Sequence, residues 1–377
     1  MDSRVSSPTA DRLVSLDALR GVDMFWLTGG TAMLLAVARG AGAPEFLELA
    51  KRWTTHAPWE GFQLHDLILP LFFFIVGAAM PLSFGKRLAR GDGKGSLYRH
   101  VWTRTALLFI LGLIGQGHLL AYDLDRLRIL YSVLESLALG YAVAAIVYLN
   151  TRVLGQAVAV AVFLLGSWAA LVWIPVPGHG AGVLTPEGNL VGYVDKLVLG
   201  PFYGGDGWGR IVSTPNCACM LLIGALACQW LRSDRGQAVK VAGLLLAGAA
   251  CVGLGLAWSP WLPIIKSIKT SSFILYATGQ SIMLLAVFYL VVDVWGWRAW
   301  TFPFVVIGMN SIAVYMAVLV FDWGPGGGLF GQIGAVFVGG LRPWLGAWWP
   351  LVHELARYTV IWLILYWMYR ARSFVRV

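Results

Sequence analysis

The sequence predicts an all-α membrane protein: a polytopic bundle of transmembrane helices in a single domain, residues 1–377. Composition is the first observation behind this prediction. Of the 377 residues, 58% are hydrophobic and only 12% are charged, whereas a soluble domain carries about 25% charged residues. The second is that the apolar residues fall into runs of about 20, the length with which an α-helix crosses the hydrocarbon core. The 19 tryptophans agree, because indole favours the membrane–water interface.

Ten apolar runs are long enough to span a membrane. They cover residues 19–39, 64–84, 104–121, 129–149, 153–174, 215–232, 239–258, 271–293, 303–321 and 351–370. An eleventh stretch, 329–341, is short and rich in glycine, which is typical of a re-entrant or interfacial segment. We therefore expect about ten spans plus this short segment. No repeat or linker divides the chain.

The distribution of basic residues predicts the orientation. Ten spans place both termini on one side, and most of the 28 Lys and Arg residues then lie in the loops of that side. Because positive charge favours the cytoplasmic face, we expect both termini in the cytoplasm. The loops 40–63, 175–214 and 258–270 then open on the outer side, and the basic loop 85–103 faces the cytosol.

The net charge of +9 does not indicate nucleic-acid binding. Its basic residues lie in short loops between apolar runs, and no soluble segment is long enough for a basic binding face. The four cysteines, Cys217, Cys219, Cys228 and Cys251, lie in apolar runs without the spacing of metal ligands. We interpret them as small buried thiols and expect no metal.

The segment from His56 to Asp66 is the most reactive part of the sequence. It places His56, Trp59, Glu60 and Asp66 within a few residues at the start of the second span. Ionisable groups at a membrane boundary are costly and therefore suggest function. Histidine exchanges protons near neutral pH, and a carboxylate beside it fixes its tautomer. Interfacial anchoring by Trp59 and His56 is an equally good interpretation of the residues alone.

Two features of the first span have structural interpretations. Asp17 and Arg20 are three residues apart, so they can pair on one helix face. A structural salt bridge is the favoured interpretation, with ligand binding as the alternative. Gly29 and Gly30 permit a close approach of backbone to a neighbouring helix or to a ligand.

Polar residues also mark the eighth and ninth spans. Lys266, Lys269 and Ser272 precede or begin the eighth span on the outer side. They suit an anionic or polar ligand, or a flank in which lysines extend to the interface. Asn310 lies inside the ninth span, where interhelical hydrogen bonding is the favoured interpretation. The sequence holds no phosphate-binding loop, hydrolase elbow, zinc spacing or dinucleotide fingerprint.

Taken together, these segments resemble the heparan-alpha-glucosaminide N-acetyltransferase family, and more closely its bacterial branch. The resemblance covers nearly the whole chain. It rests on the run Arg12 to Trp26, on His-Ala-Pro-Trp-Glu-Gly followed by Asp-Leu-Ile-Leu-Pro in the block 56–77, and on later agreements at 213–231, 266–272 and 308–312. The 56–77 block is the most specific part.

The resemblance implies a transmembrane acetyltransferase that moves an acetyl group from cytosolic acetyl-CoA to an amine or hydroxyl of a sugar on the outer side. It maps the family's catalytic histidine onto His56 and the family's aspartate onto Asp66. Our hypothesis is that His56 acts as general base or as acetyl carrier, with Asp66 or Glu60 orienting the imidazole. It also implies a bacterial inner membrane and allows a homodimer. Departures from the family pattern at Thr31, Glu60 and Glu135 leave the acceptor open.

Further binding roles follow from the same hypothesis. The basic segment 85–104 would attract the phosphates of acetyl-CoA. Lys266, Lys269 or Asn310 would stabilise the developing oxyanion. Asp17, Arg20, Trp59, Lys266, Lys269, Ser272 and Asn310 are thus candidate substrate or acetyl-CoA contacts.

Two other functional classes fit the residues. A transporter or flippase for a sugar or lipid-linked glycan also uses many spans with polar residues inside the membrane. Acetyl-CoA binding separates it from an acetyltransferase. A structural partner is the third class, and no sequence feature favours it.

Overall fold

A computed structural model describes residues 13–205, 208–322 and 328–375. These residues form helices joined by turns, with two isolated β-bridges and no β-strand. The all-α class predicted from composition is therefore confirmed.

Most helices follow the apolar runs, but the helix expected at 104–121 begins at Lys94 and ends at Gly115. The first half of the chain contains α1 (Val14–Phe25), η1 (Trp26–Gly30), α2 (Thr31–Gly40), α3 (Pro44–Thr54), η2 (Leu64–Leu67), α4 (Ile68–Ala89), α5 (Lys94–Gly115), η3 (Leu119–Ala121), α6 (Val133–Asn150) and α7 (Val153–Trp173). The second half contains α8 (Leu190–Leu199), η4 (Gly200–Phe202), α9 (Thr214–Leu231), α10 (Gln237–Trp258), α11 (Ser271–Phe288), η5 (Tyr289–Val294), η6 (Ala299–Thr301), α12 (Phe302–Met309), α13 (Ser311–Phe321), α14 (Gly328–Val338), η7 (Gly339–Leu341), α15 (Arg342–Leu345), η8 (Gly346–Trp348) and α16 (Trp349–Arg370).

The predicted number of about ten spans is not confirmed. Within the described ranges, seven helices are long and apolar enough to cross a membrane, or eight if α12 and α13 form one span bent by 65° at Asn310. Helices α5 and α16 are as long as α4 but carry more charged residues. Helix α14 has 11 residues, about 16 Å at ~1.5 Å per residue, too short to span. Several apolar helices of this length identify an integral membrane protein.

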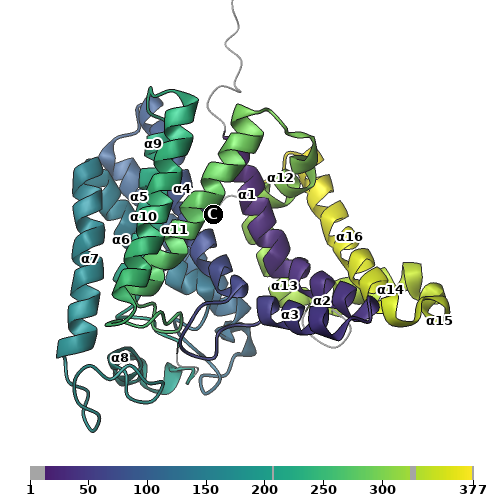
Figure 1. Ribbon diagram of the computed structural model, residues 1–377, viewed down its shortest axis with the longest axis horizontal. Helices are drawn as coiled ribbons and strands as arrows, with labels where there is room; N and C mark the ends of the chain where they lie inside the picture. The colour runs from purple at the N-terminus through teal and green to yellow at the C-terminus, as the bar shows by residue number, and fades with distance from the viewer. Residues whose placement is uncertain (1–12, 206–207, 323–327, 376–377) are drawn as a thin grey trace, which may run out of the picture.

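The helices form two groups around α4 and α1 (Figure 1). Helices α4 to α7 and α9 to α11 make the larger group, while α1, α12, α13 and α16 make the smaller one. The short helices α2, α3, α8, α14 and α15 gather at the end of the bundle away from the start of α1. That end carries the His56 loop.

Glycine permits the tightest crossings in this bundle. A Cβ atom at Gly77 of α4 would overlap the backbone of Leu221 in α9, and one at Gly224 would overlap Phe74. A Cβ at Gly29 would overlap the ring of Tyr358 in α16. The close approach predicted at Gly29 is therefore confirmed, with a neighbouring helix as the partner.

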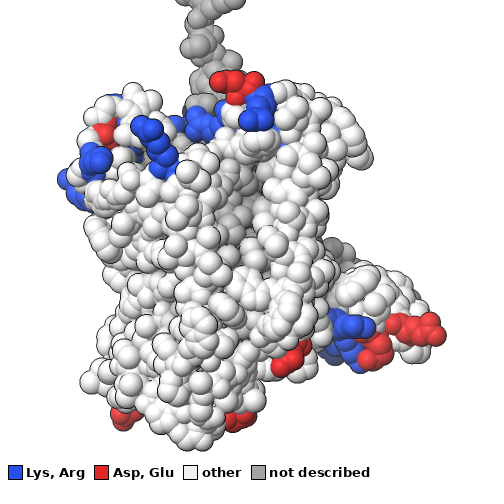
Figure 2. Space-filling view, turned by 60° about the vertical axis from the view of Figure 1, so that its left-hand side comes forward, with Lys and Arg blue, Asp and Glu red and all other residues white. Residues whose placement is uncertain are grey.

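Charged side chains are unevenly placed along the bundle. On the face shown in Figure 2, Lys and Arg gather at the end where α1 begins, and a broad middle band shows no charged side chain. A smaller group of both signs lies at the other end. Such an uncharged belt is the surface that lipid tails require.

Candidate active site

The loop that carries His56 is fixed by backbone contacts. It connects α3 to η2, and within it the N–H of Gly61 donates to the carbonyl of Ile264 over 2.8 Å. Glu60 and Ile265 pair as an antiparallel bridge beside this bond. Gly61 has φ of +107°, a backbone region that glycine alone adopts easily. The loop is therefore tied to the segment that precedes α11, more than 200 residues later.

A fully buried Asp66 holds the imidazole of His56. Oδ1 of Asp66 lies 2.8 Å from Nδ1 of His56. Oδ2 accepts hydrogen bonds from the N–H of Gln63 at 2.9 Å and of Ala57 at 3.2 Å. The second of these bonds anchors the residue next to His56, so one carboxylate fixes both the loop and the ring.

Lys266 completes this cluster from 200 positions later in the sequence. Its Nζ donates to Oδ1 of Asp66 at 3.0 Å and lies 2.9 Å from Nδ1 of His56. The ammonium also lies 5.2 Å from the ring centre of Trp208, a cation–π distance. Burial lowers the pKa of Lys266 to about 8, although Asp66 favours the charged form. The His56–Asp66–Lys266 cluster thus joins the loop before α4 to the loop before α11.

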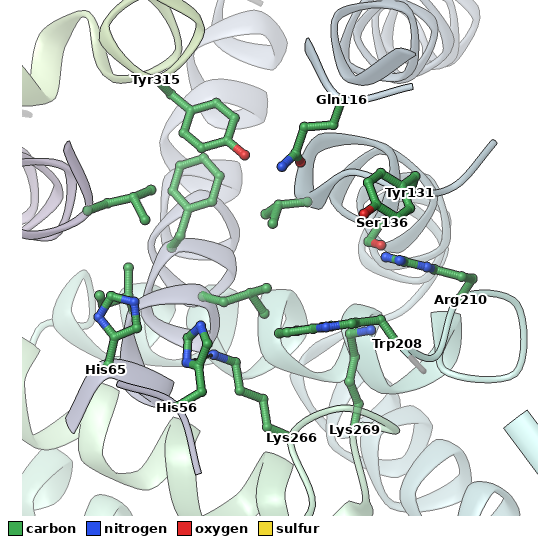
Figure 3. Close-up of a pocket in the computed structure, with 15 residues that line it drawn as sticks. His56, His65, Gln116, Tyr131, Ser136, Trp208, Arg210, Lys266, Lys269 and Tyr315 are labelled. Atoms are coloured by element: carbon green, nitrogen blue, oxygen red, sulfur yellow. Dashed lines mark hydrogen bonds between the residues drawn. The ribbon is translucent and has the colours of Figure 1, made fainter. Parts of the chain in front are cut away.

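His56 faces a cavity of about 340 Å³, here called the outer cavity. Its lining is Leu27, His56, His65, Ile68, Leu69, Phe72, Gln116, Tyr131, Val133, Ser136, Trp208, Arg210, Lys266, Lys269 and Tyr315. In Figure 3, His65, His56, Lys266 and Lys269 lie along one rim, with Tyr315 and Gln116 across the cavity from them. The side chain of His56 is 45% exposed while that of Asp66 is inaccessible. A substrate therefore reaches the imidazole but not the carboxylate.

A second cavity, of about 490 Å³, opens toward the end where α1 begins. We call it the basic cleft. Its basic lining residues are Arg20, Lys86, Arg87, Arg90, His100 and Arg104. No Asp or Glu stands among the described residues that line it. Such a cleft attracts a multiply charged anion.

One face of α4 joins the two cavities. Ile68, Leu69 and Phe72 line the outer cavity, and the residues of α4 that line the basic cleft are Phe72, Val76, Ala79, Ser83, Lys86 and Arg87. These residues recur every three or four positions, so they share one side of the helix. From Ile68 to Lys86 the helix rises by about 27 Å, close to the ~30 Å hydrocarbon core. Phe72 lines both cavities and therefore stands between them.

Glu60 and Trp59, the other predicted residues of the His56 segment, form no described hydrogen bond with His56. Glu60 is exposed, is absent from the described lining of the outer cavity, and has no described bond to His56. Trp59 donates from Nε1 to the carbonyl of Leu184 at 2.9 Å and packs in a small outer hydrophobic cluster. Trp59 therefore contacts the outer hydrophobic cluster, whereas His56 and Asp66 form a hydrogen-bonded pair at the outer cavity.

Of the remaining predicted residues, some lie near the outer cavity and others near the basic cleft. Lys269 lines the outer cavity and donates from Nζ to the carbonyl of Gly209. Ser272 is fully buried and donates to the carbonyl of Pro263, which shapes the loop before α11. At the basic end, Asp17 and Arg20 form the predicted ion pair at 3.8 Å.

Asn310 lies away from the outer cavity. It ends α12, and its Oδ1 accepts a hydrogen bond from the N–H of Val375 at 3.1 Å. Met309 and Ser311 beside it line the basic cleft. An amide at this position marks a break in the helix beside the basic cleft.

Several lining residues were not singled out from the sequence. Trp208, Arg210 and Tyr131 come from irregular segments before α9 and α6, where neither periodicity nor a motif marks them. Arg210 stacks on the Tyr131 ring at 5.5 Å. Asp195, in the same outer loop, accepts hydrogen bonds from the N–H groups of Arg210 and Ile211. In the sequence, Asp195 stands out as a charged residue within the mostly apolar α8, and this could have indicated its buried role.

Glu135, which departs from the family pattern, has a structural role. Its carboxylate accepts from the N–H groups of Leu130 and Ser132, and Ser132 caps α6 in return. Of the predicted thiols, Cys217, Cys219 and Cys228 are buried and Cys251 is partly buried. Within the described residues no cluster of three His, Cys, Asp or Glu side chains is arranged to hold a metal ion.

Comparison with known proteins finds two similar N-acetyltransferases. The chain is similar to the heparan-alpha-glucosaminide N-acetyltransferase of Homo sapiens, with 28% identity over 380 residues that cover 84% of this chain and 55% of the human protein. The Mus musculus protein of the same name is 27% identical over 368 residues, covering 81% of this chain and 54% of its own length. The chain is a relative of these N-acetyltransferases.

The resemblance inferred from the sequence is thereby confirmed. The chain spans about 55% of the length of the human relative. No family model matches the chain.

Proposed function

We propose that this chain is a membrane acyltransferase that moves an acetyl group from cytosolic acetyl-CoA to an amine or hydroxyl of a sugar on the outer side. The observation that carries the proposal is the position of the His56–Asp66 pair at one end of the α4 face and of the basic cleft at its other end. The N-acetyltransferase relatives support the reaction class.

The proposed topology places the basic cleft and both termini in the cytoplasm, in a bacterial inner membrane. The clustering of Lys and Arg at that end supports it through the positive-inside rule. Counting α5, α16 and the α12–α13 pair with the seven apolar helices gives the ten spans of this arrangement.

The donor would bind along the α4 face. Phosphates of acetyl-CoA would pair with Lys86, Arg90 and Arg104 in the basic cleft, because cations bind phosphate through charge-assisted hydrogen bonds. The pantetheine arm would follow the apolar stretch past Val76 and Phe72. The thioester would then lie in the outer cavity beside His56.

The acceptor would enter the outer cavity from the outer face. Nε2 of His56 would take the proton of the acceptor nitrogen or oxygen as that atom attacks the thioester carbonyl. A bond from carbon to nitrogen or oxygen forms, the carbon–sulfur bond breaks, and the thiolate of CoA takes up a proton. Asp66 would hold Nδ1–H and stabilise the imidazolium. Lys269, which lines the same cavity, remains the proposed cation near the oxyanion.

The test is acetyl transfer by the purified protein in liposomes, from radiolabelled acetyl-CoA to a glucosamine-terminated oligosaccharide. We expect His56→Ala to lower the rate by about 10²–10⁴-fold, the usual contribution of a general base. The matched control is His179→Ala, at an exposed histidine on the same side of the molecule. Full activity of His56→Ala would refute the assignment.

A covalent route is an alternative within the same class, with His56 carrying the acetyl group. Incubation with labelled acetyl-CoA and no acceptor separates the two routes. Label on the protein that is lost in His56→Ala supports the acetyl carrier, and unlabelled protein with active transfer supports the general base.

The second candidate function is a transporter or flippase for a sugar or lipid-linked glycan. Two cavities that open toward opposite ends, with Phe72 between them, favour this class. Acetyl-CoA discriminates. A transporter gives no thermal shift with acetyl-CoA and no transfer, whereas the acyltransferase gives both.

A further inference from the structure

The imidazole of His56 contacts two groups through one nitrogen. Nδ1 lies 2.8 Å from Oδ1 of Asp66 and 2.9 Å from Nζ of Lys266. An imidazole nitrogen has a single in-plane position, which either carries a proton and donates or holds a lone pair and accepts. Donation to Asp66 and acceptance from Lys266 therefore exclude one another.

The two arrangements differ in what His56 offers the cavity. When Nδ1–H donates to Asp66, Nε2 holds a lone pair and can accept a proton. When charged Lys266 donates to Nδ1, the ring proton lies on Nε2, which then cannot act as a base. The charge of Lys266 thus determines the tautomer of the proposed base.

We propose that Lys266 is a positioning residue that switches His56 between an idle and a basic tautomer, and that transfer requires Lys266 to be uncharged. This inference rests on the proposed function and adds a control of its base. Lys266 passes one proton to Nδ1 and Nε2 releases its proton to solvent before the acceptor binds, so the cluster loses one proton overall.

The geometry supports a switch at this position rather than a permanent ion pair. Lys266 is buried, lies over the Trp208 ring, and its loop is tied to the His56 loop through Gly61 and Ile264. Asp66 keeps its bonds from the backbone of Ala57 and Gln63 when Lys266 loses its proton. The cluster therefore has a satisfied carboxylate in both states.

Other titratable groups face His56 as well. His65 on η2 lies 4.5 Å away between ring centres, and Lys269 and Arg210 line the same cavity. Among the described contacts of Nδ1, only those with Asp66 and Lys266 decide which nitrogen bears the proton. Burial lowers the pKa of Lys266 to about 8, so its uncharged fraction rises from roughly a tenth at pH 7 to roughly nine tenths at pH 9.

The experiment compares Lys266→Met and Lys266→Arg with the unchanged protein, as kcat/KM for acetyl transfer at pH 7 and pH 9. Ionisation of the acceptor amine is common to all variants, so the ratio between variants is the measured quantity. We expect Lys266→Met to exceed the unchanged protein by about tenfold at pH 7 and to equal it near pH 9. Lys266→Arg, which cannot lose its charge, should fall below the unchanged protein by at least tenfold at pH 9.

Lys196→Met is the control, since it removes an exposed lysine of α8 at the same end of the molecule that is absent from the described lining of both cavities. Its ratio to the unchanged protein should be the same at both pH values. A Lys266→Met ratio that does not change with pH, or activity retained by Lys266→Arg at pH 9, overturns the inference. If Lys266→Met does not fold, Lys266→Arg decides alone. If the unchanged protein shows no transfer at pH 7 and none at pH 9, the proposed function is contradicted instead.

Discussion

The outer cavity and the basic cleft lie at opposite ends of one face of α4, and they are built differently. Ionisable groups of the outer cavity are few and bonded to one another, with buried Asp66 and Lys266 holding the partly exposed His56. The basic cleft instead gathers many cations, several of them long and exposed, such as Lys86 and Arg90. Fixed groups suit a reaction that depends on geometry, whereas mobile surface cations suit capture of a polyanion.

The difference implies separate kinetic signatures. Changes at the outer cavity should lower the rate of the chemical step, because they alter groups that act on the reacting atoms. Changes in the basic cleft should weaken donor binding alone, because binding that is equal in the ground state and transition state affects only KM.

Asp66→Asn tests the buried end most severely. An amide does not hold Nδ1–H as a carboxylate does, and it leaves Lys266 buried without its countercharge. We expect kcat/KM to fall by about 10²–10⁴-fold and the free energy of unfolding by about 3–5 kcal/mol, measured by transfer assays and thermal unfolding.

Glu60→Gln is the comparison for Asp66→Asn. The exposed Glu60 side chain has no described bond to His56, so stability should change by less than about 0.5 kcal/mol and transfer should continue. An equal loss of transfer in both variants would contradict the assignment of Asp66 as the orienting carboxylate.

The double variant Lys86→Met and Arg90→Met tests the basic cleft. A hydrogen bond between charged groups contributes about 1.5–3 kcal/mol, so KM for acetyl-CoA should rise at least tenfold while kcat is preserved. Added salt should diminish the difference, because exposed charges are screened. Lys94→Met is the control, since Lys94 is exposed on the same end but does not line the cleft. A fall in kcat at constant KM would overturn the donor assignment.

Trp59→Phe gives the smallest expected effect and separates anchor from site. The variant loses the hydrogen bond to Leu184 but keeps an aromatic ring in the outer cluster. We expect a loss of about 1 kcal/mol in the free energy of unfolding and unchanged kcat/KM at a temperature where the protein is folded. A large fall in kcat/KM would place Trp59 in the substrate site.

Residues close in sequence were predicted well because local spacing fixes their geometry. Helix length and composition determined the all-α membrane class, and the spacing of Asp17 and Arg20 determined their ion pair. His56 and Asp66 are ten positions apart, and this spacing alone did not decide between interfacial anchoring and an active site. The folded loop, with Gly61 at positive φ, decided that the two side chains meet.

Contacts between residues far apart in the sequence could be known only from the tertiary structure. Lys266 reaches His56 only because the segment before α11 pairs with the His56 loop, and no local pattern encodes that pairing. Trp208 and Arg210 join the cavity from an irregular loop for the same reason. By itself the sequence determined a helical membrane protein, because helix length and hydrophobicity are local properties, and it singled out His56 as a candidate. The partners of that histidine were determined by packing, which brings distant segments together.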